Sequence, residues 1–548
     1  MMRISYTRTT FYTSFRCYKL LDYEYTEDYI SPIPDSCYIK ARRLIANICM
    51  KAGIEPGTYY GKNANTVIRG IQDELVLSLT NQIALYDYVN IHVRLLRKLA
   101  FLLHCYYVDK VRYANLYELS QVDRLSAEKA IIDKRMRVMH EINDTLYFIE
   151  LNLSTARSNC HECDTDNFNE LTAYAHWVAL LLDDASITYR TSDIVYIVVN
   201  DDYSIDSEGT DNPEFQEYNK RTYDSGDYGV GDKDVDNHYL NMAIAALEKE
   251  LRIDFQTLID LMNYLQSFAP EISVRLDTNV YQTDIKLLLE DFLNKINYQT
   301  SYNDAAQCLQ FLTINCEELL AHNEKGSEFL PIGRRKDRPN RFEIKPILII
   351  DNNKILFSPP HIRYVHRRWI DGLLNWYIPY ESGLNETVKV LEKWKHYYEN
   401  KMVLDLKKVF HNSGYNNVKH NYVIKRPDRY GDYPNDIGDY DVLAINDRRH
   451  EIWIIECKLI KKVGSFAEMY EQQENFFNNK RYIEKFQRRI EFMTNHYKEV
   501  LGKEIDEKHE YTIISKMCIN KVFAARFKQV DIDILSFDEL KTLIEKKQ

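Results

Sequence analysis

The sequence predicts a chain in two parts: a large, mainly α-helical N-terminal region and a C-terminal α/β domain with a central mixed sheet flanked by helices. Three observations lead to this fold class. Apolar residues recur at helical spacing, opposite charged faces, over much of residues 1–330. A basic stretch with two short β-like runs follows over residues 331–384. From residue 385 to 548, helical and strand-like segments alternate.

The N-terminal region is predicted to pack as a set of amphipathic helices that sense, bind or assemble. One short β-like run, Ile194–Val199, interrupts the helical pattern, and there is no repeat of fixed period. The helical stretches are Ile71–Tyr107, Ser126–Leu151, Phe168–Leu182, His238–Phe268 and Asp284–His322.

Residues 201–236 form an acidic segment, with nine Asp and three Glu against three basic residues. Such a composition predicts a solvated surface loop. The run DKDVDNH within it lacks the Gly and the distal Glu of an EF-hand, so a calcium site is disfavoured.

Composition is that of an ordinary soluble protein. The 548 residues suffice for two to four domains, and the net charge of −11 excludes a uniformly basic surface but not a local basic groove. The 42 tyrosines favour a helical core with wet edges over a base-stacking surface. The N-terminus lacks the apolar run of a signal peptide, and Ile83–Val108 carries too many charges for a membrane span. We therefore expect a cytoplasmic protein with no membrane partner.

Ten cysteines are scattered without framework spacing, which predicts reduced, mostly buried thiols. Cys160 and Cys163 form a CxxC pair, but no second pair follows at the spacing of a zinc site. Cys308 and Cys316 could complete such a site in space. An ordinary loop or helix start is favoured over zinc binding or a redox motif.

Residues 331–384 are expected to form a basic β-hairpin bridge between the two parts. The segment EIKPILIIDNNKILFSPP reads as two strands joined by a turn at residues 351–353. Basic residues on both sides of it suggest a surface that contacts nucleic-acid phosphates, although charge runs are more often solvated faces. The predicted phosphate contacts are Arg334, Arg335, Lys336, Arg338, Arg341, Arg367 and Arg368.

The C-terminal domain, residues 385–548, is predicted to run helix, three strands, helix, two strands, helix. The expected segments are helix Glu386–Phe410, strands Val418–Ile424, Asp441–Ile445 and Glu451–Leu459, helix Phe466–Tyr497, strands Tyr511–Ile519 and Ile532–Ser536, and helix Phe537–Lys546.

Within this domain, Gly438–Asn446 and Glu451–Leu459 are expected to pair as a hairpin. Because side chains alternate along a strand, Glu456 and Lys458 share one face. Pairing brings Asp441 near Glu456. Two carboxylates and an ammonium then meet at one edge of the sheet, which is costly unless a metal or a phosphate balances the charges.

This set of groups suits phosphodiester hydrolysis. Asp441, Glu456 and the backbone carbonyl of Cys457 offer the hard oxygen ligands that Mg²⁺ prefers, and such a metal activates water and polarises a phosphoryl oxygen. Lys458 can orient or deprotonate that water. Glu399 lies on the apolar stripe of the preceding helix, either at its solvent edge or serving the site.

These motifs, Gly-Asp-Tyr-Asp-Val-Leu-Ala at 438–444 and Glu-Cys-Lys at 456–458, resemble the PD-(D/E)XK, or restriction-endonuclease-like, nuclease superfamily. They are most similar to Mrr-type restriction enzymes and Holliday-junction resolvases. The resemblance implies Mg²⁺ on Asp441 and Glu456, with Mn²⁺ able to substitute, a catalytic Lys458 and an assisting Glu399. It also implies a glutamine on the next helix, for which Gln473 is chosen at even odds with Gln472.

The expected function is therefore Mg²⁺-dependent cleavage of nucleic acid, DNA rather than RNA on the resemblance alone. A role in restriction or anti-phage defence is a fold-level analogy. A non-cleaving nucleic-acid-binding protein with an inactive nuclease fold and a structure-specific DNA repair nuclease are the alternatives. No GxxxxGK[ST] loop is present, so an ATP-driven step needs a partner subunit. Cutting both strands with one site favours a homodimer or such a partner.

Overall fold

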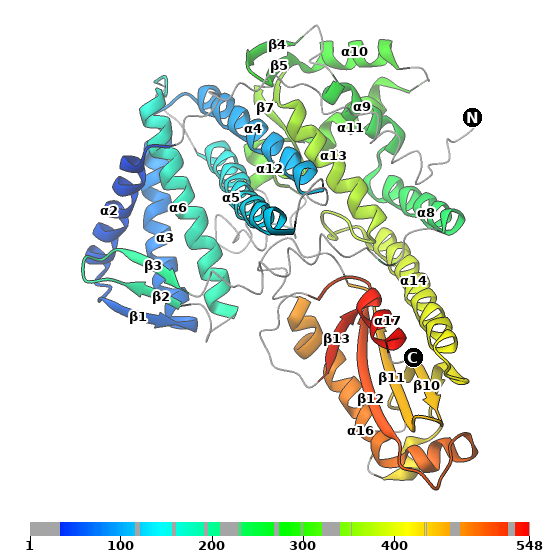
Figure 1. Ribbon diagram of the computed structural model, residues 1–548. Coiled ribbons are helices and arrows are strands. Elements are labelled where there is room, and N and C mark those ends of the chain that lie inside the picture. The colour runs from blue at the N-terminus through cyan, green and yellow to red at the C-terminus, as the bar shows by residue number, and fades with distance from the viewer. Residues whose placement is uncertain are drawn as a thin grey trace. The chain divides into compact units, whose positions relative to one another are not determined.

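The chain divides into two compact units in the computed structural model. Unit 1 comprises Met1–Asp211 and Asn237–Val390, and unit 2 comprises Asn212–Asp236 and Leu391–Gln548 (Figure 1). The residues that the structure describes are 33–114, 121–155, 161–190, 196–208, 228, 232–267, 273–296, 300–320, 340–351, 353–431, 433–434, 436–460, 472–523 and 532–546. No helix within these ranges combines the length and apolar character needed to cross a membrane.

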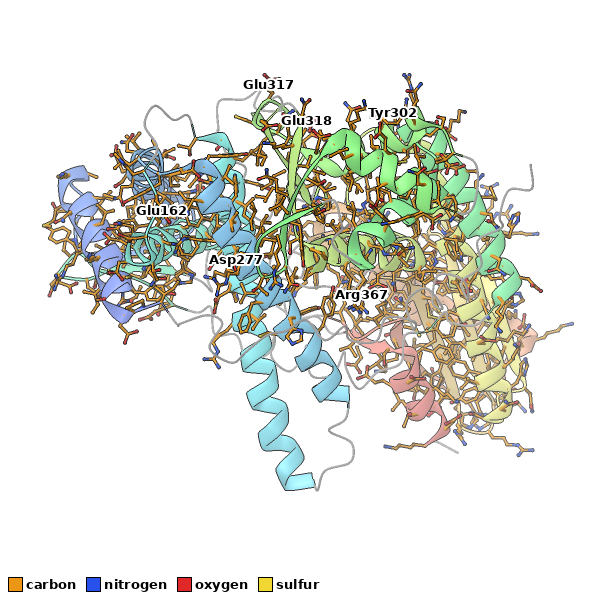
Figure 2. The ribbon with its side chains drawn as sticks, turned by 90° about the horizontal axis from the view of Figure 1, so that it is seen from above. Glu162, Asp277, Tyr302, Glu317, Glu318 and Arg367 are labelled. Carbon is orange, nitrogen blue, oxygen red and sulfur yellow. The ribbon has the colours of Figure 1, made fainter. Side chains whose placement is uncertain are left out.

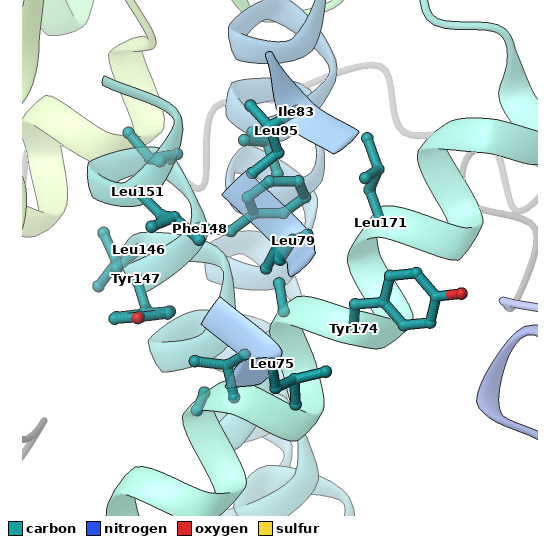
Figure 3. Packing of buried hydrophobic residues seen from close by; sticks show 14 of the residues in the cluster. Leu75, Leu79, Ile83, Leu95, Leu146, Tyr147, Phe148, Leu151, Leu171 and Tyr174 are labelled. Atoms are coloured by element: carbon teal, nitrogen blue, oxygen red, sulfur yellow. The ribbon is translucent and has the colours of Figure 1, made fainter. Parts of the chain in front are cut away.

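Unit 1 is mainly helical, as predicted. Its core is formed where α3 packs against α6 and α4 packs against α5. Leu79 of α3, Leu95 of α4 and Phe148 of α5 are fully or almost fully buried and converge in this core (Figure 3). The helices of unit 1 are α2 Asp35–Ala52, α3 Gly61–Ile83, α4 Tyr88–Ala114, α5 Gln121–Ser154, α6 Thr165–Arg190, α9 Phe255–Ser267, α10 Ile285–Lys295, α11 Tyr302–Leu312, α12 Cys316–Leu320 and α13 Pro359–Leu374. Helix α8, Lys233–Leu251, begins in unit 2 and continues into unit 1.

Several predicted helical stretches are each divided into shorter helices. Ile71–Tyr107 becomes α3 and α4, and Asp284–His322 becomes α10, α11 and α12. A capping residue marks one of the new helix starts: the side chain of Ser301 accepts from the amide of Asp304 at the start of α11. Apolar periodicity continues across such breaks because consecutive helices face the same core.

Unit 1 also contains two sheets, most of whose strands the sequence did not predict. A three-stranded sheet has the order β1-β2-β3, and a five-stranded sheet the order β4-β5-β8-β7-β6. Most of these strands have four or five residues, too few for a clear alternation of apolar and polar positions. They are β1 Gly57–Tyr60, β2 Tyr196–Val199, β3 Ile205–Glu208, β4 Val274–Asp277, β5 Val280–Asp284, β6 Thr313–Ile314, β7 Ile347–Asp351 and β8 Lys354–Phe357.

The predicted hairpin of residues 331–384 is present as β7 and β8, which pair antiparallel from Ile347↔Phe357 onward. It lies inside the five-stranded sheet of unit 1, between β5 and β6. The hairpin is therefore part of unit 1 and not a separate bridge, because both of its outer edges pair with other strands.

The predicted acidic loop, 201–236, contains regular structure in its described part. Ile205–Glu208 forms β3, which pairs with β2, and the first turn of α8 takes up residues 233–236. Residues 209–227 and 229–231 lie outside the described part of the chain.

Unit 2 has the predicted order of elements around a central mixed sheet. The strand order is β13-β12-β11-β10-β9. The pairs β9–β10 and β10–β11 are antiparallel, and the pairs β11–β12 and β12–β13 are parallel. The elements are α14 Asn385–Asn412, which begins in unit 1, β9 Asn417–Val423, β10 Asp439–Asn446, β11 Glu451–Lys458, α16 Tyr482–Leu501, β12 Thr512–Ile519, β13 Asp533–Ser536 and α17 Phe537–Glu545.

The two faces of this sheet are covered by different helices. Phe486, Phe492 and Met493 of α16 join a buried cluster with Ile452 and Ile454 of β11. On the other face, Phe410 of α14 contacts the Trp453 ring, with centroids 5.6 Å apart. Alternation along β11 thus sends even-numbered side chains towards α16 and odd-numbered ones towards α14.

Unit 2 is completed by a segment from much earlier in the sequence, which we call the strap (Tyr228 and residues 232–236). Tyr228 donates from its hydroxyl to Asp405 of α14 (2.8 Å) and from its amide to the carbonyl of Asn520 (3.1 Å). Asp236 is buried and accepts from the Tyr398 hydroxyl (2.5 Å) and the Trp394 indole (3.2 Å). Unit 2 therefore does not consist of residues 385–548 alone.

Candidate active site

The β10–β11 hairpin brings the predicted acidic residues together. Val442 pairs with Ile455, so the register places Asp441 opposite Glu456. Lys458 lies two residues beyond Glu456, on the same face of the sheet and at the end of β11. The structure therefore juxtaposes the three residues that the alternation of the two strands predicts.

Lys458 is the centre of this group. Its Nζ lies 2.9 Å from Glu456 Oε1 and 3.9 Å from Asp441 Oδ2, and it donates to the Cys457 carbonyl at 2.9 Å. Burial lowers the pKa of Lys458, but the charges of Glu456 and Asp441 outweigh that effect and hold it above its ordinary value. Lys458 is therefore an ammonium here, which suits charge neutralisation better than the deprotonation of water.

Asp441 is mostly buried, and its Oδ2 accepts the amide of Cys457 at 2.6 Å. Burial raises the pKa of Asp441, and the negative charge of Glu456 raises it further. Two carboxylates this close in a poorly solvated place need positive charge to stay ionised together. The pair thus has the electrostatic character of a cation site.

Arg489 of α16 supplies part of that positive charge. Its Nη2 lies 2.6 Å from Glu456 Oε2, and both side chains are less than a tenth exposed. Its Nη1 donates to the Asp439 carbonyl, and the backbone carbonyl of Arg489 accepts the Tyr440 hydroxyl at 2.8 Å. The guanidinium also lies against Gly438, where an added Cβ would come within 3.2 Å of Nη1. Arg489 therefore fixes Glu456 and the start of β10 together.

Sequence reasoning missed the role of Arg489, although a signal was present. It occupies the buried face of α16 between Phe486 and Met493, where an apolar residue is expected. A charged residue at such a position is normally paired with an opposite charge. An ion pair between Arg489 and an acidic residue of the site was therefore a possible inference from the sequence.

Glu399 reaches the same end of β11 from α14. Its Oε1 accepts the amide of Leu459 at 3.1 Å, and its Oε2 lies 2.9 Å from His396 Nδ1. The side chain is 17% exposed, so it lies at the edge of the buried stripe. Glu399 thus lies at the edge of the stripe and contacts the chain just after Lys458, and a part for it in the site stays a prediction.

Asn520 and Tyr482 also contact this end of the sheet and were not predicted. The Asn520 side chain accepts the amide of Ile460 at 2.6 Å, which holds the chain just after Lys458. The Tyr482 ring lies 5.6 Å from Lys458 Nζ. Asn520 directly follows the end of β12, and Tyr482 is the first residue of α16. At the ends of strands and helices the apolar periodicity gives no indication of such contacts.

The two candidate glutamines, Gln472 and Gln473, lie in the described part of the chain. Gln473 is buried and Gln472 is half-buried, in a short helical segment before the π-helical turn Asn475–Asn479. Residues 461–471 lie outside the described chain. The choice between the glutamines therefore stays a prediction.

The predicted phosphate-binding surface is not supported where it can be described. Arg341 is 2% exposed, pairs with Glu343 at 2.9 Å and donates to the Pro379 carbonyl. Arg368 also pairs with Glu343. Arg367, labelled in Figure 2, is half-buried. Its guanidinium lies 4.5 Å from the Tyr107 ring centroid. Arg341 and Arg368 are thus internal ion-pair partners in unit 1. Arg334, Arg335, Lys336 and Arg338 lie outside the described residues.

The donor set of the site fits Mg²⁺ or Mn²⁺ in kind. Oxygens of Asp441, Glu456 and the Cys457 carbonyl all surround one ammonium, which occupies the position of a cation. The described residues include no group of three or more His, Cys, Asp or Glu side chains that could hold a metal ion. This holds for the surroundings of Cys163 as well, and Cys160 lies outside the described ranges.

No protein-family model, curated protein or solved structure matches the chain. What the fold and site define is a mixed α/β protein with a carboxylate–ammonium–guanidinium cluster at one end of the central sheet of unit 2.

Proposed function

We propose that unit 2 is a metal-dependent nuclease with a restriction-endonuclease-like fold, and that it acts on DNA. One observation carries the proposal: Asp441, Glu456 and the Cys457 carbonyl direct oxygens at a single cationic position. Hard oxygen ligands of this kind suit Mg²⁺ or Mn²⁺. The mixed sheet with helices on both faces and the sequence resemblance of residues 438–444 and 456–458 support the same conclusion.

The residues divide the chemistry among them. Asp441, Glu456 and the Cys457 carbonyl would hold the metal, which supplies an activated water and polarises the phosphoryl oxygen. Lys458 neutralises charge that develops on the phosphate. Glu399 fixes the end of β11 through the Leu459 amide. A part in restriction or anti-phage defence is proposed by analogy alone.

The test is cleavage of supercoiled plasmid by the full-length protein with Mg²⁺ or Mn²⁺, against EDTA and a Lys458→Ala variant. We expect metal-dependent nicking or linearisation, and a loss of at least about a hundredfold in the variant. Lys516→Ala is the matched control. Lys516 is the register partner of Ile455, so its side chain lies on the opposite face of the sheet from the Glu456 side chain. On that face its Nζ lies 2.7 Å from the Asp533 carboxylate. An RNA of the same sequence, assayed alongside, tests the preference for DNA.

One observation favours a second candidate, a protein that binds nucleic acid without cutting it. Both carboxylate oxygens of Glu456 are already engaged, by Lys458 and by Arg489. DNA binding that is equal in wild type and Lys458→Ala, with no cleavage under either metal, would establish this candidate and overturn the nuclease.

A further inference from the structure

The position of the Lys458 ammonium is the one that a metal ion would need. Its Nζ lies 2.9 Å from Glu456 Oε1, 2.9 Å from the Cys457 carbonyl and 3.9 Å from Asp441 Oδ2. Mg²⁺ binds oxygens at about 2.0–2.1 Å. A cation at that distance from the same oxygens, on the face towards which the side chains point, would overlap the ammonium.

Arg489 restricts how Glu456 could bind a metal ion while Lys458 stays in place. A carboxylate could offer its second oxygen to a metal while the first keeps its ammonium. In Glu456 the second oxygen, Oε2, is bound by Arg489 at 2.6 Å. The guanidinium is itself held by the Asp439 carbonyl and packed against Gly438, so it cannot shift without moving the start of β10. Only Oε1 is left to exchange one cation for another.

The four charged groups in direct contact balance one another without a metal. Two cationic groups, Lys458 and Arg489, contact the two carboxylates of Asp441 and Glu456. A divalent cation added to this set gives the site an excess of positive charge, even with the carboxylate of Glu399 close to Lys458, unless an anion enters as well. The phosphodiester of a nucleic acid is such an anion, and a displaced lysine ammonium is a good partner for it.

We propose that Lys458 is a built-in competitor of the metal: its ammonium holds the cation position until a divalent ion displaces it towards the substrate phosphate, and Arg489 makes the two occupants mutually exclusive. This inference rests on the proposed metal site. It deepens that proposal, because it makes metal uptake and phosphate binding cooperative, and such linkage is reciprocal.

The first test is Mn²⁺ binding to full-length protein, measured by the electron paramagnetic resonance signal of free Mn²⁺, without nucleic acid. Lys458→Met removes the competitor, so we expect Mn²⁺ to bind at least about tenfold more tightly than in wild type. Lys458→Arg keeps a cation there and should stay weak. Lys516→Met, on the opposite face of the sheet, should match wild type.

A second measurement uses wild type only and does not depend on the folding of a variant. Reductive methylation followed by mass spectrometry reports the accessibility of each lysine amine. Saturating Mg²⁺ should increase the labelling of Lys458 several-fold and leave Lys516 unchanged.

The outcomes separate the inference from the function on which it rests. Equal Mn²⁺ affinity in wild type and Lys458→Met, with labelling of Lys458 unaffected by Mg²⁺, overturns the competition while the metal site stands. Absence of Mn²⁺ binding in every variant at millimolar metal overturns the proposed metal site and the competition with it.

Discussion

Substitution of Asp236 should show whether the strap contributes to the stability of unit 2. Asp236 is 1% exposed, and its carboxylate accepts hydrogen bonds from the Tyr398 hydroxyl at 2.5 Å and the Trp394 indole at 3.2 Å. Both of those side chains are fully buried on α14. Asp236→Ala removes the acceptor of both bonds while leaving the chain in place.

The expected cost follows from these two bonds. A buried donor that loses its acceptor costs about 1–3 kcal/mol, so two of them cost about 2–6 kcal/mol. Native domains are stable by only about 5–15 kcal/mol. For a unit of this size, each kcal/mol lowers the melting temperature by roughly 2–4 °C. The substitution should therefore leave unit 2 marginally stable.

Hydrogen exchange at increasing urea measures this effect in one unit of a two-unit chain, because peptides from β11 and β12 report on unit 2. Asp234→Ala is the control. Asp234 is exposed in the same first turn of α8, so its loss should cost only the ~0.3–1 kcal/mol of a helix-terminus charge. A free energy of unfolding for Asp236→Ala within about 0.5 kcal/mol of the control would refute the role of the strap.

Three further predictions concern single contacts. Glu399→Gln weakens the hold on the end of β11 and should lower the cleavage rate about 10–100-fold, measured on plasmid at saturating metal. Arg489→Met leaves a buried carboxylate without its guanidinium and should cost about 3–5 kcal/mol in urea unfolding of unit 2. The third is a pH dependence of unit 1: burial lowers the pKa of His176, but the hydrogen bond and charge of Asp144, 2.6 Å away, raise it above 6.5 overall. A raised histidine pKa stabilises the fold at low pH, so this contribution should be lost as the pH rises above the ordinary histidine value and through the raised pKa of His176.

Each of these predictions can be compared with a control variant that should give a different result. Glu392→Gln and Arg488→Met change exposed residues on the same helices and should leave rate and stability near wild type. Asp144→Asn should flatten the pH dependence of the unfolding free energy of unit 1. A slope that persists in Asp144→Asn, or equal losses in a variant and its neighbour, would contradict the corresponding contact.

The core of the candidate site followed from sequence because it depends on local pattern. Glu456 and Lys458 are two residues apart on a strand, and a short turn fixes the register of Asp441 opposite them. The contact of Arg489 was not predicted, because its partner Glu456 lies 33 positions away and nothing local specifies that contact. The prediction of a basic surface was wrong at Arg341 for the same reason: sequence does not reveal that this arginine is buried and that Glu343 pairs with both Arg341 and Arg368.

For the fold, long amphipathic helices such as α5 and α6 and the hairpin of β10 and β11 were predictable from periodicity. The short strands β1, β3, β4, β5 and β6 were not. They gain stability from neighbours distant in sequence, as when β5 pairs with β8 through Gln282↔Leu356. The division of the chain was also beyond local pattern, because α8 and α14 each pass from one unit to the other without a break in their helical signal.

The strap has a consequence for synthesis on the ribosome. Asp236 emerges 158 residues before Trp394 and 162 before Tyr398, with residues 237–390 of unit 1 made in between. The amide of Tyr228 must then wait for Asn520, which follows the fourth strand of the sheet to be translated. A nascent chain that stops before Asn520 lacks the backbone partner of the Tyr228 amide and also β13, although the Tyr228 hydroxyl can already bind Asp405. The central sheet that carries the candidate site is therefore complete only once residue 536 has been translated.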